Sequence, residues 1–171
     1  MINAEGVPFE LRSRFPYFIS LMNDERKAMD EALRKLVLPQ LHALGFKGSL
    51  PHFRRLASDG LDVLTFQFDR HGGGFVIEVA RCSQEGFTTT WGKTIPSNKV
   101  TTWDLPSSWR HRIQPLSGSG TDSWFRFENG NVREAAVAVL GQIPRIEIWF
   151  QSEQQPVVST DRPKATISGT S

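Results

Sequence analysis

Side chains that could bind an anion recur at alternate positions in several segments between residues 52 and 126. A period of two places alternate side chains on one face of a β-strand. By this rule one sheet face carries a set of predicted ligand-binding residues: Arg54, Thr65, Gln67, Glu78, Arg110, Arg112, Trp124 and Arg126. His52 shares that face. Arginines beside tryptophans suit carboxylates, phosphates or single-stranded nucleic acid.

The same pattern is also typical of a solvated sheet face. An ion pair between Arg54 and Glu78, bridged over Thr65, would stabilise such a face by only ~0.2–1 kcal/mol. Periodicity assigns a side chain to a face, but it does not show that several side chains converge on one site. The solvated face is therefore the simpler interpretation, and a shared binding site is the hypothesis to test.

Motifs for catalysis or metal binding are not recognisable in the sequence. None of the histidines has a zinc-ligand spacing; they are His42, His52, His71 and His111. The glycine run at 72–74 leads into a strand, whereas a phosphate-binding loop leads into a helix. We therefore expect no catalytic residue, no metal site and no cofactor, and we favour a binding protein over an enzyme.

Length and composition describe one ordinary globular domain. The chain has 171 residues, of which 39% are hydrophobic and 22% are charged, so it can bury a core without a metal or a disulfide. The net charge of +2 is too small to require a nucleic-acid partner, although it does not exclude one. Cys82 is the single cysteine. No apolar run approaches the ~20 residues of a membrane span, so we expect a cytoplasmic location and no membrane partner.

The centre of the predicted fold is an antiparallel hairpin over residues 61–82. Phenylalanines alternate with other residues on both sides of the glycine run, which is typical of two strands joined by a tight turn. The turn fits at residues 71–72 or one residue later. These two registers place Glu78 opposite Thr65 or opposite Gln67.

A third strand ends just before an Asp-Gly pair at residues 59–60. Such a pair between two extended runs favours a two-residue type I′ turn. That turn would place Phe53 opposite Phe66 and Arg54 opposite Thr65. Phe53 would then join the buried face of the sheet, and Arg54 would join the other face.

Two amphipathic helices flank these strands. An apolar stripe at helical spacing predicts the first helix from a cap at Asn23 or Asp24 to Leu44, with a kink at Pro39. A second stripe predicts a helix over residues 132–143.

The other segments give weaker patterns. Residues 145–150 fit a short helix opened by a proline or a strand, and we favour the helix. Further strands are predicted at 109–116 and 123–128, and residues 83–108 form a long excursion of the kind that is often functional. The chain divides into an N-terminal arm at 1–22, a single α+β domain at 23–150 and a disordered polar tail at 151–171.

Together these elements predict an α+β fold, with an antiparallel β-sheet of four to five strands and two main helices packed on one face. The predicted core pairs strand residues with helix residues: Phe53, Leu64, Phe66, Phe68, Phe75, Ile77 and Val79 with Leu33, Leu36, Val37, Leu41, Val139 and Leu140. The opposite face, which holds the predicted ligand-binding residues, has no cover from these helices.

The order of these parts resembles a known family. A helix ending in LHALGFKGS is followed by PHFRRL, by the LTFQFDRHGGGFVIEVA hairpin and by the late HRIQPL and WFRF segments. This order is similar to an uncharacterised bacterial family catalogued as domain of unknown function 4304, over residues 24–150. The resemblance implies a small α+β domain, and it brings no activity, site residue or cofactor.

The function that these patterns favour is a small cytosolic binding module. Its partner would be a protein or an anionic ligand, held on the face that carries the arginines and tryptophan. The alternative is an enzyme or binder that acts on phosphate-containing ligands or nucleic acid through the same arginines. A flat apolar patch would favour a protein partner, and an arginine-lined cleft would favour an anion.

The tail allows a first test. Residues 155–171 offer no apolar face to bury, so their deletion should leave the melting temperature unchanged within error. Thermal unfolding of the full chain and of a chain ending at Gln154 makes the comparison. A lower melting temperature in the shorter chain would show that the tail docks on the domain, and Val157 and Val158 would be the residues to substitute next.

Overall fold

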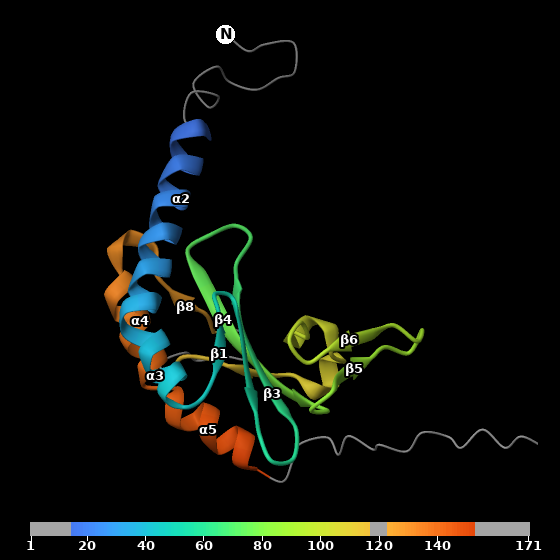
Figure 1. Cartoon of the computed structure of the whole chain (residues 1–171). Helices are drawn as coiled ribbons and strands as arrows, with labels where there is room; N and C mark the ends of the chain where they lie inside the picture. Colours follow the sequence, from blue (N-terminus) through green and yellow to red (C-terminus); the bar gives the residue numbers. More distant parts are fainter. Residues whose placement is uncertain (1–14, 117–122, 153–171) are drawn as a thin grey trace, which may run out of the picture.

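A computed structural model describes residues 15–116 and 123–152, with side chains from residue 24 onward (Figure 1). Its centre is an antiparallel sheet in the order β1-β2-β3-β4-β7, with β8 also paired to β4. The strands are β1 Lys47–Ser49, β2 His52–Leu56, β3 Leu61–Phe68, β4 Gly74–Cys82, β7 His111–Ile113 and β8 Phe125–Arg126. Helices cover one face, so the predicted α+β class is confirmed. Most of the predicted N-terminal arm, and the tail from residue 153, lie outside the described residues.

The first helical segment begins earlier than predicted. Helix α2 spans Phe15–Ala32 and therefore crosses the expected boundary at Asn23 or Asp24. Pro16 stands at the second position of this helix, where the backbone N–H groups have no partner within the helix, so a missing N–H costs little. Polar residues at 23–24 are therefore inside the helix rather than at its cap.

The predicted irregularity at Pro39 takes the form of a π turn. Helix α2 continues into a π-helical turn at Leu33–Val37, and the N–H of Leu38 donates to the carbonyl of Leu33, five residues back. The α-helix α3, Leu38–Ala43, then begins with the proline in its first turn. Gly45 ends the segment with a φ of 89°, a left-handed conformation that glycine adopts without strain.

The second helical region is two helices. Helix α4 spans Val132–Leu140 and helix α5 spans Ile143–Gln151, so the single helix predicted over 132–143 is divided. Pro144 stands in the first turn of α5, which confirms the helix that we favoured for residues 145–150. In the part of the chain that the structure describes, none of the helices has the length and apolar character needed to cross a membrane.

The β2–β3 hairpin has a register two residues away from the predicted one. Phe53 pairs with Leu64, and His52 rather than Arg54 pairs with Thr65. The turn is not type I′, because neither residue at 59–60 has the positive φ that this turn requires. A shift of two residues keeps every side chain on its predicted face.

The correct register gives a buried carboxylate its partners. Asp62 lies opposite Arg55 and Arg81 in one row across three strands, and both arginines bond to its carboxylate. The predicted register would have placed Asp62 beside Ala57, away from Arg55. An unpaired buried charge is strongly destabilising, which explains why the type I′ turn is not formed.

The β3–β4 hairpin adopts one of the two registers left open by the sequence. Thr65 lies opposite Glu78. The face toward the helices is the main core, and it confirms the predicted set: Phe53, Leu64, Phe66, Phe75, Ile77, Val79, Leu33, Val37, Leu41 and Val139 are buried, and Phe68, Leu36 and Leu140 are partly buried against them.

The second face, opposite the helices, is partly covered by the excursion that follows β4. Residues 83–110, which we call the cap, contain the short strands β5 Gly86–Thr88 and β6 Thr94–Pro96 and two 3₁₀ turns, η2 Thr102–Asp104 and η3 Ser107–Trp109. The helices lie on one side of the sheet and the β5–β6 pair on the other (Figure 1). Val100 and Leu105 of the cap pack in a second core on Val63 and Ala80. The helices leave this face uncovered, as expected, but the cap covers part of it, which was not expected.

The main core gives a stability test at Phe66. Its side chain is 1% exposed, and its ring centre lies 5.9 Å from that of Phe53 and 5.8 Å from that of Phe75. Phe66→Ala should lower the free energy of unfolding by ~3–5 kcal/mol, because it removes a large core side chain and leaves a cavity. Denaturant unfolding measures this, with Ile148→Ala as the control because Ile148 is 65% exposed. A loss below ~1 kcal/mol for Phe66→Ala would contradict the core assignment.

Candidate functional site

The strand register aligns four polar side chains in one row across the second face. His52, Thr65, Glu78 and Arg112 lie opposite one another on β2, β3, β4 and β7. The imidazole Nδ1 of His52 is 3.0 Å from Thr65 Oγ1, and Arg112 Nη2 is 3.7 Å from Glu78 Oε1. Three of the predicted ligand-binding residues therefore stand side by side in this row.

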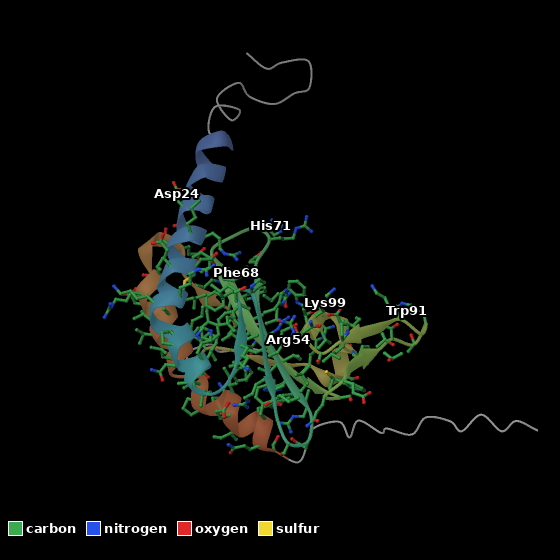
Figure 2. All side chains as sticks on the ribbon, viewed as in Figure 1. Asp24, Arg54, Phe68, His71, Trp91 and Lys99 are labelled. Carbon is green, nitrogen blue, oxygen red and sulfur yellow. The ribbon has the colours of Figure 1, made fainter. Side chains whose placement is uncertain are left out.

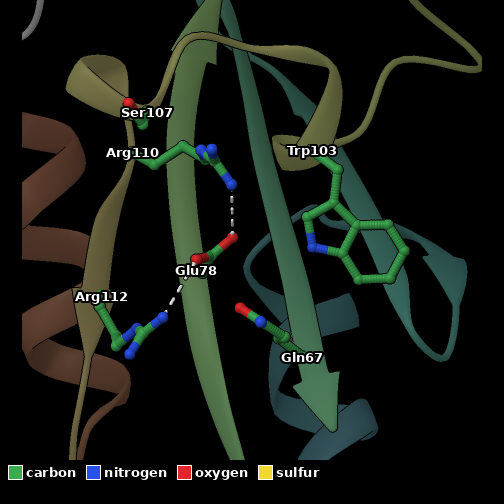
Figure 3. A pocket seen from close by; sticks show the side chains of 6 residues that line it. All are labelled: Gln67, Glu78, Trp103, Ser107, Arg110 and Arg112. Carbon is green, nitrogen blue, oxygen red and sulfur yellow. Dashed lines mark hydrogen bonds and ion pairs between the residues drawn. The ribbon is translucent and has the colours of Figure 1, made fainter. Parts of the chain in front are cut away.

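A pocket of about 350 Å³ opens beside this row, between the sheet and the cap (Figure 3). Its lining consists of Gln67, Glu78, Trp103, Ser107, Arg110 and Arg112. The strands β3, β4 and β7 supply Gln67, Glu78 and Arg112, and the cap supplies the other three. A volume of this size lies in the range of small-molecule pockets, roughly 300–1,000 Å³. The sheet and the cap thus bring four of the predicted residues together.

Glu78 forms the floor of the pocket with its hydrogen-bonding capacity incompletely used. Its side chain is only 8% exposed. The donors that approach it are Thr102 Oγ1 at 3.4 Å, Arg110 Nη1 at 3.4 Å and Arg112 Nη2 at 3.7 Å. Charge-assisted hydrogen bonds are normally about 2.7–2.9 Å long. The two arginines therefore offset the negative charge of Glu78, although neither of them makes a short hydrogen bond to it.

Arg110 has a buried donor without an acceptor. Its Nε is buried and has no hydrogen-bond partner among the residues that the structure describes. An unsatisfied buried donor costs about 1–3 kcal/mol, so native proteins have few of them. Because this Nε is buried, a ligand in the pocket would meet the terminal nitrogens of Arg110 rather than the Nε.

Trp103 forms the wall opposite the arginines (Figure 3). It is 52% exposed, and its ring meets the His52 ring edge to face, with the centres 4.9 Å apart. Burial lowers the pKa of His52 below its usual 6.5, and the charge of Arg54 lowers it further. His52 is therefore neutral at pH 7, and it supports Trp103 as an aromatic ring rather than as a cation.

Arg54 holds the cap instead of lining the pocket. Its Nε donates to the carbonyl of Val100 at 2.6 Å, and its Nη2 donates to the carbonyl of Lys99 at 3.0 Å. Arg54 and Lys99 lie where the sheet and the cap meet (Figure 2). The predicted pair between Arg54 and Glu78 is wrong, because the observed register places them in different rows.

Trp124 and Arg126 lie at the margin of the site. Strand β8 pairs with the first residues of β4, where Arg126 is opposite Gly74. Arg126 Nη1 is 3.8 Å from Asp69 Oδ2, so this arginine is engaged outside the pocket. The guanidinium carbon of Arg112 lies 5.8 Å from the centre of the Trp124 ring, so Trp124 contacts the site through Arg112.

Sequence reasoning missed the two lining residues of the cap, Trp103 and Ser107. The excursion has no hydrophobic period from which a face could be assigned. One local signal was present: Thr101 and Asp104 have the spacing of a capping box. Thr101 donates its N–H and its Oγ1 proton to Asp104 Oδ2, each at 2.8 Å, and this turn presents Trp103.

The arrangement suits an anion better than a metal ion or a nucleophilic reaction. Within residues 15–116 and 123–152 no group of three His, Cys, Asp or Glu side chains is placed to hold a metal. Burial raises the pKa of the Cys82 thiol to about 11, so Cys82 is not a thiolate at neutral pH. Two arginines, an amide, a hydroxyl and an indole in one pocket instead provide hydrogen-bond donors and an aromatic surface.

Comparison with known proteins gives one match. The model of a family described as "Domain of unknown function (DUF4304)" matches residues 37–152. The match contains the sheet, the cap and every residue that lines the pocket, while α2 and most of the π turn lie before it. No curated protein and no solved structure matches the chain.

The role of Arg54 can be tested by stability. Arg54→Ala should lower the free energy of unfolding by about 1–3 kcal/mol, because it removes a charged donor from two carbonyls, one of them on the buried residue Val100. It should also speed hydrogen exchange at the amides of Asp104 in η2 and of Leu105, which follows η2. The matched control is Arg70→Ala, since Arg70 is exposed on the β3–β4 turn. Equal stability and equal exchange in the two variants would show that Arg54 does not hold the cap.

Proposed function

This chain belongs to the family described as a domain of unknown function (DUF4304), and we propose that it is a binding module whose pocket takes an anionic group. That group is a carboxylate or a phosphate, on a small molecule or on an exposed side chain of a partner. The shared chemistry of these ligands is a compact anion attached to a planar or apolar body. We place the module in the cytoplasm, as expected from the sequence.

The observation that supports this proposal is the convergence of Arg110 and Arg112 on one pocket. The Glu78 carboxylate lies between the two guanidinium groups (Figure 3), and both contact it at distances longer than a normal charge-assisted bond. The buried Nε of Arg110 adds a donor in need of an acceptor. A ligand anion would accept hydrogen bonds from the terminal nitrogens of these guanidinium groups.

The pocket wall supports a ligand with a flat body. Trp103 exposes about half of its surface, and aromatic rings bind planar groups at little entropic cost. Gln67 and Ser107 add neutral polar groups for orientation. The cap would therefore contribute the aromatic wall and the charge of Arg110, while the strands would contribute Gln67, Glu78 and Arg112.

A reaction on a phosphate-containing ligand would use the same arginines. The lining offers Glu78 as its one carboxylate, so hydrolysis of a bound phosphate ester would be the activity to assay. We favour binding because the lining side chains supply contacts to an anion, whereas a positioned nucleophile with its own base is not among them.

The proposal is tested by NMR with a library of small carboxylates and phosphates and their neutral amide counterparts. Anionic members should shift the indole N–H signal of Trp103, and the amides should not. Arg110→Gln should weaken binding by about tenfold or more, since a charged hydrogen bond contributes ~1.5–3 kcal/mol. Added salt should weaken binding as well, through screening over ~8 Å.

Arg70→Gln is the matched control for Arg110→Gln, because it removes the same charge at an exposed turn. Circular dichroism and melting temperature establish that both variants fold. Binding that persists in folded Arg110→Gln, or that shifts signals only outside the pocket, would contradict the proposal. Turnover of a phosphate ester that needs Arg110 would establish the enzymatic alternative instead.

A further inference from the structure

We propose that the pocket takes a nucleotide, with the edge of the base on the Gln67 amide, the ring of the base on Trp103 and the phosphate on Arg110. This inference rests on the proposed function, and it names the ligand class that the same pocket would take. The residue that it adds is Gln67, which becomes the specificity-determining residue for the planar part of the ligand.

The side-chain amide of Gln67 is not used within the protein. It lines the pocket from β3, and it makes no hydrogen bond among the residues that the structure describes. Its polar neighbours on the second face are engaged, since Thr65 Oγ1 is 3.0 Å from His52 Nδ1 and Glu78 accepts from Arg110. The Gln67 amide is therefore available to a ligand.

An amide selects a particular kind of ligand edge. It offers a donor and an acceptor side by side, and rotation about its last side-chain bond exchanges their positions. Its complement is an edge with an acceptor next to a donor, which nucleobases carry; a glutamine binds adenine through two such bonds. A carboxylate or a phosphate dianion offers only acceptors, so it would leave the amide oxygen of Gln67 without a donor.

Trp103 supplies the surface on which the base would stack. Its side chain is 52% exposed, and its ring is positioned by the edge-to-face contact with His52, with the centres 4.9 Å apart. Aromatic side chains stack on any base, because every base has a π face. A ring that is already held in place loses little conformational freedom when it binds.

The arrangement of these groups suits a ligand with a base at one end and a phosphate at the other. In Figure 3 the Arg110 guanidinium and the Gln67 amide lie on either side of the Glu78 carboxylate, and the Trp103 ring faces them from across the pocket. The Arg110 side chain is 27% exposed, so its terminal nitrogens can meet a phosphate. The ribose would join the two ends within a pocket of about 350 Å³.

Three probes isolate the contact with Gln67. Uridine and adenosine 5′-monophosphates carry a donor–acceptor edge, whereas phenyl phosphate has the same type of phosphate ester and a ring without that edge. Gln67→Met keeps the length of the side chain and removes both polar atoms. It should weaken binding of the better-bound nucleotide by about tenfold, since a two-bond base contact discriminates by roughly that factor, and it should leave phenyl phosphate unchanged. Isothermal titration calorimetry gives each dissociation constant.

Gln40→Met is the matched control, because it removes the same amide from an exposed position on α3. It should change the affinity for none of the probes. Circular dichroism and melting temperature establish that both methionine variants fold.

A second variant tests the stacking surface. Trp103→Ala should weaken nucleotide binding by about tenfold or more and leave the binding of inorganic phosphate unchanged, because inorganic phosphate has no ring to stack. Trp103→Phe keeps an aromatic face and should retain most of the nucleotide affinity. Equal losses for nucleotide and inorganic phosphate in the folded alanine variant would contradict the assigned role of Trp103.

A free nucleotide and the end of a nucleic-acid strand share this chemistry, and titration of a 5′-phosphorylated hexauridylate separates them. Tighter binding of the hexamer than of uridine 5′-monophosphate identifies a strand end as the source. Equal or weaker binding of the hexamer identifies a free nucleotide.

The outcomes also separate this inference from the function on which it rests. If phenyl phosphate binds through Arg110 while Gln67→Met weakens neither nucleotide, the nucleotide inference is overturned and the anion pocket stands. If neither the nucleotides nor phenyl phosphate bind the wild-type chain, the anion pocket is overturned, and this inference with it.

Discussion

The buried carboxylate of Asp62 is the constraint on which the sheet register depends. It is fully buried, and it accepts from Arg55 Nε and Nη2 at 3.0 Å and 2.8 Å and from Arg81 Nε at 2.7 Å. Arg55 continues to Glu147 of α5 at 2.8 Å, so the same pair also ties a helix to the sheet. Breaking a buried pair of this kind is strongly destabilising, by roughly 3–5 kcal/mol, and a slipped register would break it.

This row of charges also determines where the pocket residues meet. Once Asp62 lies between Arg55 and Arg81, the strand period alone places Thr65 beside Glu78 three residues further along. Asp62 and Glu78, both buried carboxylates of the sheet, differ in the length of the hydrogen bonds that they accept. Asp62 is saturated by short bonds on the helix side, which is the signature of a structural role, whereas Glu78 has only long contacts on the pocket side. That contrast supports a structural role for Asp62, whereas Glu78 belongs to the proposed anion pocket.

The sequence predicted correctly which face of the sheet each side chain occupies, but it did not predict which residues are neighbours across strands. Alternation assigned Phe53 and Phe66 to the core and Gln67 and Glu78 to the other face, and a register error of two residues left those assignments intact. Neighbours depend on register, and here register depends on an ion pair between residues on different strands. The local Asp-Gly signal favoured a turn that this long-range pair overrides. The register that this turn implies placed Arg54 beside Thr65, and therefore in the predicted site, whereas in the structure Arg54 holds the cap.

The structure of the cap could not be predicted from its sequence, because its conformation depends on contacts with residues of the sheet. Its backbone is held by Arg54 of β2, which donates to two of its carbonyls, and its apolar residues Val100 and Leu105 find their contacts on β3 and β4. Neither interaction leaves a periodic pattern within residues 83–110. Yet the cap supplies Trp103, and the pocket forms between the cap and the sheet. A sheet face that would otherwise be a solvated surface thereby becomes a concave site with a buried carboxylate, two arginines and an aromatic wall.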